Sequence, residues 1–141
     1  MTRVNLVPVA ELADQHLFAE WRELKMVPRS LARSLASRPA ALVLARVPTE
    51  FCLNTGHVMF FYDKAGFLRK RYQALTDELL DRGVAINPNH GLDLLGVWDS
   101  VNSDFHCDYA PTPMALRLSQ ERITQRLALR PGWYRHRGRL L

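Results

Sequence analysis

The start of the chain encodes an amine, a carboxylate and arginines within a short stretch of sequence. Thr2 is small, so removal of Met1 would leave its α-amine as the N-terminus, while Arg22 and Glu23 follow on a predicted helix. An α-amine has an unperturbed pKa of about 8, against about 10.4 for lysine, and the cations of Arg3 and Arg22 would lower it further. A partly neutral amine, a carboxylate and phosphate-binding arginines are the groups that imine chemistry on a sugar of DNA requires.

Positive charge is concentrated at the two ends of the chain. The net charge is +5, to which residues 1–71 contribute +5, residues 72–108 contribute −6 and residues 109–141 contribute +6. If the basic ends meet in the fold they form a cationic face, whose natural partner is a polyanion. A solvated helix face would explain either basic run alone. Two runs, joined to a tail at 130–139 that interleaves aromatic and basic residues, favour nucleic acid.

Apolar residues at helical spacing predict a long first helix that begins near Asp14. Pro28 lies on the same face, so we expect the helix to be kinked or interrupted there. Asp14 is the predicted N-cap. Arg22 and Glu23 lie off the apolar stripe, which leaves both side chains free to face a ligand.

Two further helices are predicted downstream. One runs from about residue 63 to residue 82, with Asp63 as its cap and Gly83 as the residue that ends it. The other begins at Thr112, a capping residue followed by proline, and ends near Leu129. The segments 39–62 and 84–111 carry clusters of proline, glycine and asparagine and are predicted to be mainly loops.

These patterns predict an all-α fold, in which residues 1–141 form one compact domain of three main helices with ordered loops and an extended basic-aromatic C-terminal tail. No apolar run approaches the ~20 residues that span a bilayer, and no secretory segment follows Met1, so we expect a cytoplasmic monomer without a membrane partner. Cys52 and Cys107 are expected to be free, buried thiols. Asp104, His106, Cys107 and Asp108 cluster in sequence without the spacing of a closed zinc site, and there is no phosphate-binding glycine loop. We therefore expect no metal and no nucleotide cofactor.

Six blocks of sequence, collinear and at compatible spacing, carry a resemblance to a known family. They are residues 1–6, 11–17, 19–24, 56–58 with 60–64, 67–71, and finally Ser119, Gln120 and Arg122 with residues 130–134. In these blocks the chain resembles the phage-type pyrimidine-dimer DNA glycosylase/AP lyases, the endonuclease V of ultraviolet repair. The family's compact all-α fold agrees with the predicted helices.

The resemblance implies a base-excision repair enzyme that acts on duplex DNA containing pyrimidine dimers and needs no cofactor. The Thr2 amine would attack C1′ of the damaged nucleotide, and the resulting imine would permit β-elimination. Glu23 would stabilise an oxocarbenium-like state and later move protons, while Glu20, one helical turn earlier, is expected to be structural. Residues that match the family's DNA contacts are Arg3, Gln15, His16, Arg22, Arg122 and Arg126. For His16 a structural role at the helix start is equally open.

Two departures from the phage pattern leave alternatives open. That pattern has proline and then arginine after Leu24, whereas this chain has Lys25 and Met26. Its tail is also poorer in tyrosine, and we expect Trp133 to anchor that tail to the core. One alternative is therefore a glycosylase of the same fold that acts on another damaged or modified base. The other alternative is a non-catalytic, basic DNA-binding protein.

Overall fold

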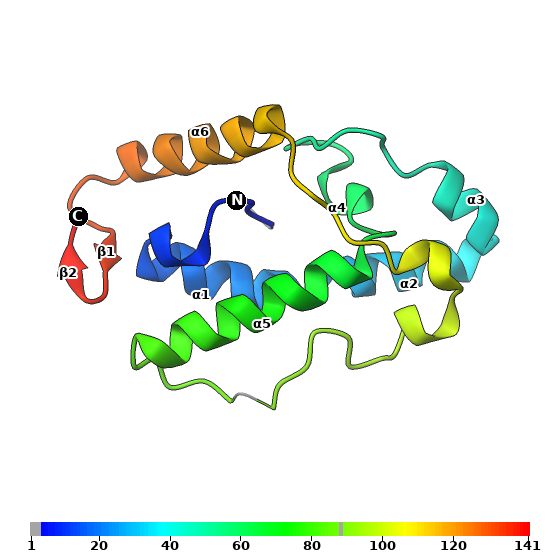
Figure 1. Cartoon of the computed structure of the whole chain (residues 1–141), viewed down its shortest axis with the longest axis horizontal. Coiled ribbons are helices and arrows are strands. Elements are labelled where there is room, and N and C mark those ends of the chain that lie inside the picture. The colour runs from blue at the N-terminus through cyan, green and yellow to red at the C-terminus, as the bar shows by residue number, and fades with distance from the viewer. Residues whose placement is uncertain (1–3, 88) are drawn as a thin grey trace.

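The computed structural model describes residues 4–87 and 89–141, so Thr2 and Arg3 lie outside the described residues. Four longer helices form the molecule: α1 (Asp14–Glu23), α2 (Met26–Ser37), α5 (Ala65–Asp81) and α6 (Pro113–Leu129). Helix α5 packs along α1, and α6 lies on the opposite side of the N-terminal segment, which runs between them (Figure 1). The predicted all-α class is confirmed.

Short elements complete the described chain. They are the helices α3 (Ala40–Ala45) and α4 (His57–Phe60), the 3-10 turns η1 (Val9–Glu11), η2 (Trp98–Ser100) and η3 (Ser103–Phe105), and the strands β1 (Arg135–His136) and β2 (Arg139–Leu140). Residues 39–62 are mainly loop and turn, as predicted, but they also contain the short helices α3 and α4. Residues 84–111 do form loops with short turns, as predicted.

The predicted first helix is two helices, and Pro28 explains why. Pro28 has no N–H to donate to the carbonyl of Leu24, and its ring would collide with that carbonyl in a continuous helix. The N–H of Val27 bonds to Leu24 O instead, at 3.1 Å, and the chain turns between α1 and α2. The interruption thus falls one turn before Pro28. It makes Glu23 the last residue of α1.

The predicted helix ends are confirmed at some positions and wrong at others. Thr112 caps α6 by accepting a hydrogen bond from the Ala115 N–H at 3.1 Å, and Gly83 follows α5 with φ of +80°. Asp14 and Asp63 do not cap, because each carboxylate binds side chains or backbone elsewhere.

The carboxylate of Asp14 fixes the C-terminal tail, which is a β-hairpin rather than an extended segment. It accepts hydrogen bonds from the N–H groups of Arg137 and Gly138 and from the buried guanidinium of Arg82. Burial alone would raise the pKa of Asp14, but the bonds from Gly138, Arg82 and Arg137 together hold that pKa below its ordinary value. The hairpin lies beside the start of α1 (Figure 1).

Residues 4–7 form a buried N-terminal segment in which each residue is bonded to a different element. We call the four side chains that hold it the N-terminal clamp. Val4 N–H donates to His57 Nε2 (3.2 Å), Asn5 Nδ2 to Glu20 Oε1 (2.8 Å), Leu6 N–H to Ser119 Oγ (2.9 Å), and Arg71 Nη1 to Val7 O (2.6 Å). Within the clamp, Glu20 and Arg71 also pair with each other through two bonds of 2.7 and 2.9 Å. The structural role expected of Glu20 is confirmed.

The rest of the interior is a single apolar core. One apolar core joins all the long helices, with Leu17, Leu68 and Trp98 fully buried. Cys52 and Cys107 are free thiols, but only Cys52 is partly buried and Cys107 is exposed, which corrects the expectation for Cys107. Among the described residues, every helix is too short or too polar to cross a membrane.

The Glu20–Arg71 pair generates a stability prediction. Replacing Glu20 with glutamine leaves the Arg71 guanidinium buried without its counter-charge, so the free energy of unfolding should fall by about 3–5 kcal/mol. Urea denaturation monitored by circular dichroism measures the loss. Glu23→Gln, the same chemical change one residue before the helix break, serves as the matched control and should cost under about 1 kcal/mol. Equal losses in the two variants would contradict a structural role specific to Glu20.

Candidate active site and nucleic-acid interface

An open pocket of about 590 Å³ lies where α1 ends and α2 begins. Its lining includes Phe18, Trp21, Arg22, Glu23, Lys25, Met26, Arg29 and His90. Glu23 is half-buried in this wall, and Arg22 is exposed, with its guanidinium carbon 5.7 Å from the centre of the Phe18 ring. The interruption caused by Pro28 therefore places the predicted carboxylate and its neighbouring arginine at the mouth of a cavity.

Positive charge dominates this pocket. Lys25 is only 8% exposed, and its Nζ lies 4.8 Å above the Trp21 ring. Burial, and then repulsion from Arg29 and Arg22, lower the pKa of Lys25 below its ordinary value. Within the described residues no carboxylate forms a salt bridge with any of these three cations. A bound anion would relieve their mutual repulsion, as the phosphates of a polyanion do.

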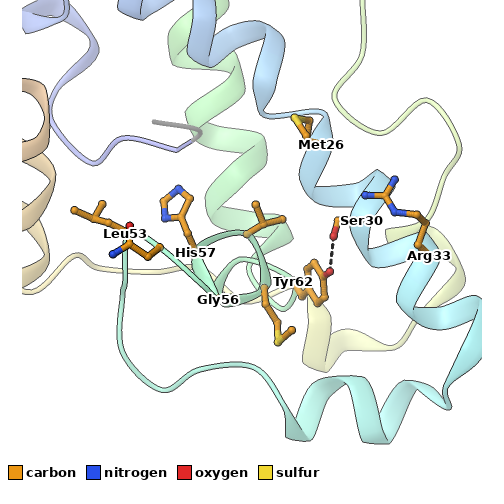
Figure 2. A pocket seen from close by; sticks show the side chains of 10 residues that line it. Met26, Ser30, Arg33, Leu53, Gly56, His57 and Tyr62 are labelled. Carbon is orange, nitrogen blue, oxygen red and sulfur yellow. Dashed lines mark hydrogen bonds between the residues drawn. The ribbon is translucent and has the colours of Figure 1, made fainter. Parts of the chain in front are cut away.

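A second pocket, of about 420 Å³, lies on the other side of Met26 (Figure 2). Its walls are α2 and the loop that leads into α4. The hydroxyls of Tyr62 and Ser30 share a hydrogen bond of 2.5 Å across it. Met26 lines both pockets. The sequence has Met26 where the phage pattern has an arginine, and the structure places this apolar side chain in the walls of both cavities.

His16 is buried at the start of α1, against the C-terminal tail. Its ring centre lies 4.5 Å from that of Tyr134. Burial lowers the pKa of His16, and the positive charge of Arg126 on α6 lowers it further, so both effects favour the neutral imidazole. Its Nδ1 is buried without a hydrogen-bond partner among the described residues. Two predicted site residues from opposite ends of the chain, His16 and Arg126, thus lie within electrostatic reach of each other.

Gln15 and Trp133 have roles that the sequence did not indicate. The amide nitrogen of Gln15 donates to the carbonyl of Trp133 at 2.8 Å, and its amide oxygen accepts from the N–H of Arg135 at 3.1 Å. Both polar atoms of the Gln15 side chain therefore bind the tail. The Trp133 side chain is half-exposed under the guanidinium of Arg130, at 4.1 Å. The tail ring that packs against the start of α1 is therefore Tyr134, which contacts His16, while Trp133 holds the tail through its backbone.

Arg122 and Arg126 occupy the side of α6 that faces the N-terminal segment. Arg122 lies one helical turn after Ser119, which binds Leu6, and its Nε is buried with no hydrogen-bond partner among the described residues. Arg126 follows one turn later, near His16. The two basic ends of the chain therefore meet in the fold, as the charge distribution required. Thr2 and Arg3, the remaining predicted site residues, lie outside the described part.

The acidic middle of the chain neutralises a particular subset of the cations. Salt bridges join Arg69 to Asp99, Lys70 to Asp108, Arg71 to Glu20, Arg82 to Asp14 and Glu78, and Arg137 to Glu78 and Asp81. Arg22, Arg29, Arg122 and Arg126 have no such pair among the described residues. Sequence reasoning counted net charge by segment, whereas the structure shows which cations remain available to a partner.

Side chains of the types that ligate metals are dispersed in the part of the chain that the structure describes. Among the described residues no group of three histidine, cysteine, aspartate or glutamate side chains converges on one point. His106, from the acidic cluster noted in the sequence, bonds to the Trp98 carbonyl and to Arg69, and Asp108 bonds to Lys70.

A known protein family matches the part of the chain that forms the α1–α2 pocket. A family model described as pyrimidine dimer DNA glycosylase matches residues 1–92 of the 141. The matched region contains α1, α2, α4 and α5, and with them three members of the N-terminal clamp and the pocket that Glu23 lines. The resemblance seen in the sequence is confirmed, and the chain belongs to the pyrimidine dimer DNA glycosylase family, whose members are DNA repair enzymes.

Proposed function

We propose that the protein excises pyrimidine dimers through an imine formed by its own N-terminal amine and then nicks the strand. The observation that carries this proposal is the N-terminal clamp. Four buried side chains fix residues 4–7, so the amine of Thr2, two residues before Val4, is tethered to a rigid scaffold. A clamp on residues 4–7 supports an N-terminal nucleophile, because it holds the segment that leads to the amine.

The chemistry follows from the proposed groups. The neutral amine of Thr2 attacks C1′ as the glycosidic bond breaks, and the released base leaves with the bonding electrons and takes up a proton. Opening of the sugar ring gives an imine at C1′. Removal of a C2′ proton then breaks the bond from C3′ to its phosphate oxygen, which cuts the strand. Water finally hydrolyses the imine and regenerates the amine.

Glu23 is the proposed acid–base group. A carboxylate beside C1′ stabilises positive charge that develops on the sugar, and it can afterwards accept the proton from C2′. The half-buried position of Glu23 in a cationic pocket supports this assignment, since phosphates bound by Arg22 and Lys25 would bring the sugar close to it. An extrahelical nucleotide would reach the pocket at an unstacking cost of a few kcal/mol, which is smallest at a damaged site.

A second candidate function concerns lesion choice. Met26 stands between the two pockets, where the phage pattern has an arginine. An apolar side chain there favours contact with a base over contact with a phosphate. A glycosylase of the same fold that prefers another damaged or modified base is therefore the alternative, and a panel of lesion-bearing duplexes separates the two.

Blocking the amine tests the proposed nucleophile. Retention of Met1, or acetylation of the N-terminus, should abolish strand cleavage and borohydride trapping on a duplex containing a pyrimidine dimer. Affinity for the same duplex should change little, because one amine adds little to a surface of several arginines. The measurement pairs the intact mass of the preparation with a cleavage gel. Full activity from a homogeneously blocked protein would rule out the amine as nucleophile.

Glu23→Gln tests the acid–base assignment. Glutamine keeps the size of the side chain and removes its charge, so the single-turnover rate of base release should fall by about 10²-fold or more. Binding should be retained or slightly tighter, because one negative charge leaves a phosphate-facing pocket. The control is Glu121→Gln, an exposed glutamate on α6. Near-normal turnover in Glu23→Gln would transfer the role to another carboxylate.

The basic surface of α6 is tested by the salt dependence of binding. Binding affinity falls as salt rises, with a slope of about −0.9 in log–log units for each phosphate that the protein neutralises. Replacing Arg122 and Arg126 by glutamine should remove two such contacts and reduce the magnitude of the slope by about 0.9 for each. Damaged and undamaged duplexes should weaken almost equally, because phosphate contacts position DNA without reading it.

The matched control for the α6 variant is the double replacement of Arg69 and Lys70 by glutamine. Both cations are paired with acids, Asp99 and Asp108, so this variant should leave the slope nearly unchanged. Fluorescence anisotropy over a range of salt concentrations measures both variants. If the α6 variant kept the original slope, the DNA surface would have to lie on α1 and the tail instead.

A further inference from the structure

The two ring nitrogens of His57 make different hydrogen bonds, and both partners are backbone groups. Nδ1 lies 2.7 Å from the carbonyl oxygen of Cys52, which can only accept, so Nδ1 carries the hydrogen. Nε2 lies 3.2 Å from the N–H of Val4, which can only donate, so Nε2 presents its lone pair. The backbone therefore selects one neutral tautomer of His57, the form with hydrogen on Nδ1.

The loop before α4 holds this imidazole rigidly. Gly56 begins α4 with φ of +93°, and a Cβ there would lie 3.3 Å from Pro48 and 3.4 Å from Cys52 Sγ, so the turn requires glycine. The His57 ring is packed edge-on between Phe51 and Phe61, with ring centres 5.5 and 5.6 Å away. Only 5% of the residue is exposed. Figure 2 shows the ring directed from the α4 turn toward the N-terminal segment.

Among the clamp residues, His57 binds nearest to the start of the chain. It holds Val4, whereas Glu20, Ser119 and Arg71 hold the residues that follow. Without this bond the first hydrogen-bonded residue of the segment is Asn5, and Val4 is held only by its buried side chain. The peptide group of Val4, which leads to the amine, is then free to shift. A misplacement of only about 1 Å at a reacting group can cost about 10²-fold in rate.

We propose that His57 is a positioning residue for the N-terminal amine, acting through the hydrogen bond between its Nε2 and the Val4 N–H. The proposal rests on the proposed function, because it concerns the placement of the nucleophile assigned there. The role assigned to His57 is to hold the Val4 peptide group, and it requires no proton transfer. Among the bonded groups of the segment, this peptide group lies nearest to the amine. By limiting the motion of this group, His57 reduces the conformational entropy that the amine loses when the imine forms.

Two substitutions separate the two bonds of the imidazole. Asparagine places its amide nitrogen near the position of Nδ1, so His57→Asn can keep the bond to Cys52 O but cannot reach Val4. Glutamine places its amide oxygen near the position of Nε2, so His57→Gln can accept from the Val4 N–H but loses the bond to Cys52. Both variants lose the aromatic packing against Phe51 and Phe61. The difference between them therefore reports the Val4 bond.

The experiment measures borohydride trapping in single turnover, at saturating concentrations of a duplex that contains one abasic site. We expect the trapping rate of His57→Asn to fall about tenfold or more below that of His57→Gln, which should remain within about threefold of the original protein. Dissociation constants for an undamaged duplex should agree among the three proteins. Amide hydrogen exchange at Val4 should be protected in the original protein and in His57→Gln, and should become fast in His57→Asn.

Equal trapping rates in the two variants would overturn the inference. Fast hydrogen exchange at the Val4 amide of the original protein would also overturn it, and this measurement does not depend on the folding of any variant. A fall in DNA affinity that accounts for the whole loss of rate would also overturn it, since a positioning role predicts a change at saturation. Failure of the original protein to be trapped at all overturns the proposed function instead, and the exchange result at Val4 then still stands by itself.

Discussion

The fold depends on the burial of a non-helical segment at its centre. Residues 4–7 lie between α6 and the α1–α5 pair, where their peptide groups have neither water nor a regular ladder to bond to. A buried peptide group without a partner costs about 1–3 kcal/mol. Each group that the clamp satisfies removes such a cost, and the clamp draws on α1, α4, α5 and α6 to do so. Three of the long helices, α1, α5 and α6, are therefore arranged around residues 4–7 and not merely around an apolar core.

Local sequence patterns predicted the elements that depend on local chemistry. Helical spacing, the Thr112–Pro113 start and the Gly83 end were sufficient to locate α5 and α6, because caps and helix ends are decided within a few residues. The same reasoning located the interruption near Pro28 but placed it one turn late. A proline ring collides with the carbonyl four residues earlier, here that of Leu24, and the chain turns there.

Predictions that failed did so where a distant partner competed with a local one. Aspartate is a residue type favoured at helix N-caps, which is why Asp14 was predicted to cap α1. Its carboxylate instead binds the buried Arg82 and the tail hairpin, which lie more than 65 residues away in sequence. Gln15, which matches a DNA contact of the family, also holds the tail, and that role depends on a partner 118 residues away. For the candidate site, residue identity and helix spacing placed Arg22 and Glu23 correctly on an open face. Nothing local marked His57 or Ser119 as partners of the N-terminal segment, since those pairings span 53 and 113 residues.

The contact between Leu6 and Ser119 also constrains the order in which the protein can mature during synthesis. Residues 4–7 leave the ribosome early, but Ser119 belongs to the last quarter of the chain. Until α6 has emerged and folded, Leu6 lacks the bond that ties this segment to α6. A nascent or C-terminally truncated chain would thus carry every residue of the α1–α2 pocket and still lack part of the N-terminal clamp. Under the proposed mechanism, alignment of the amine would therefore depend on the synthesis of α6 as well as on that of the pocket.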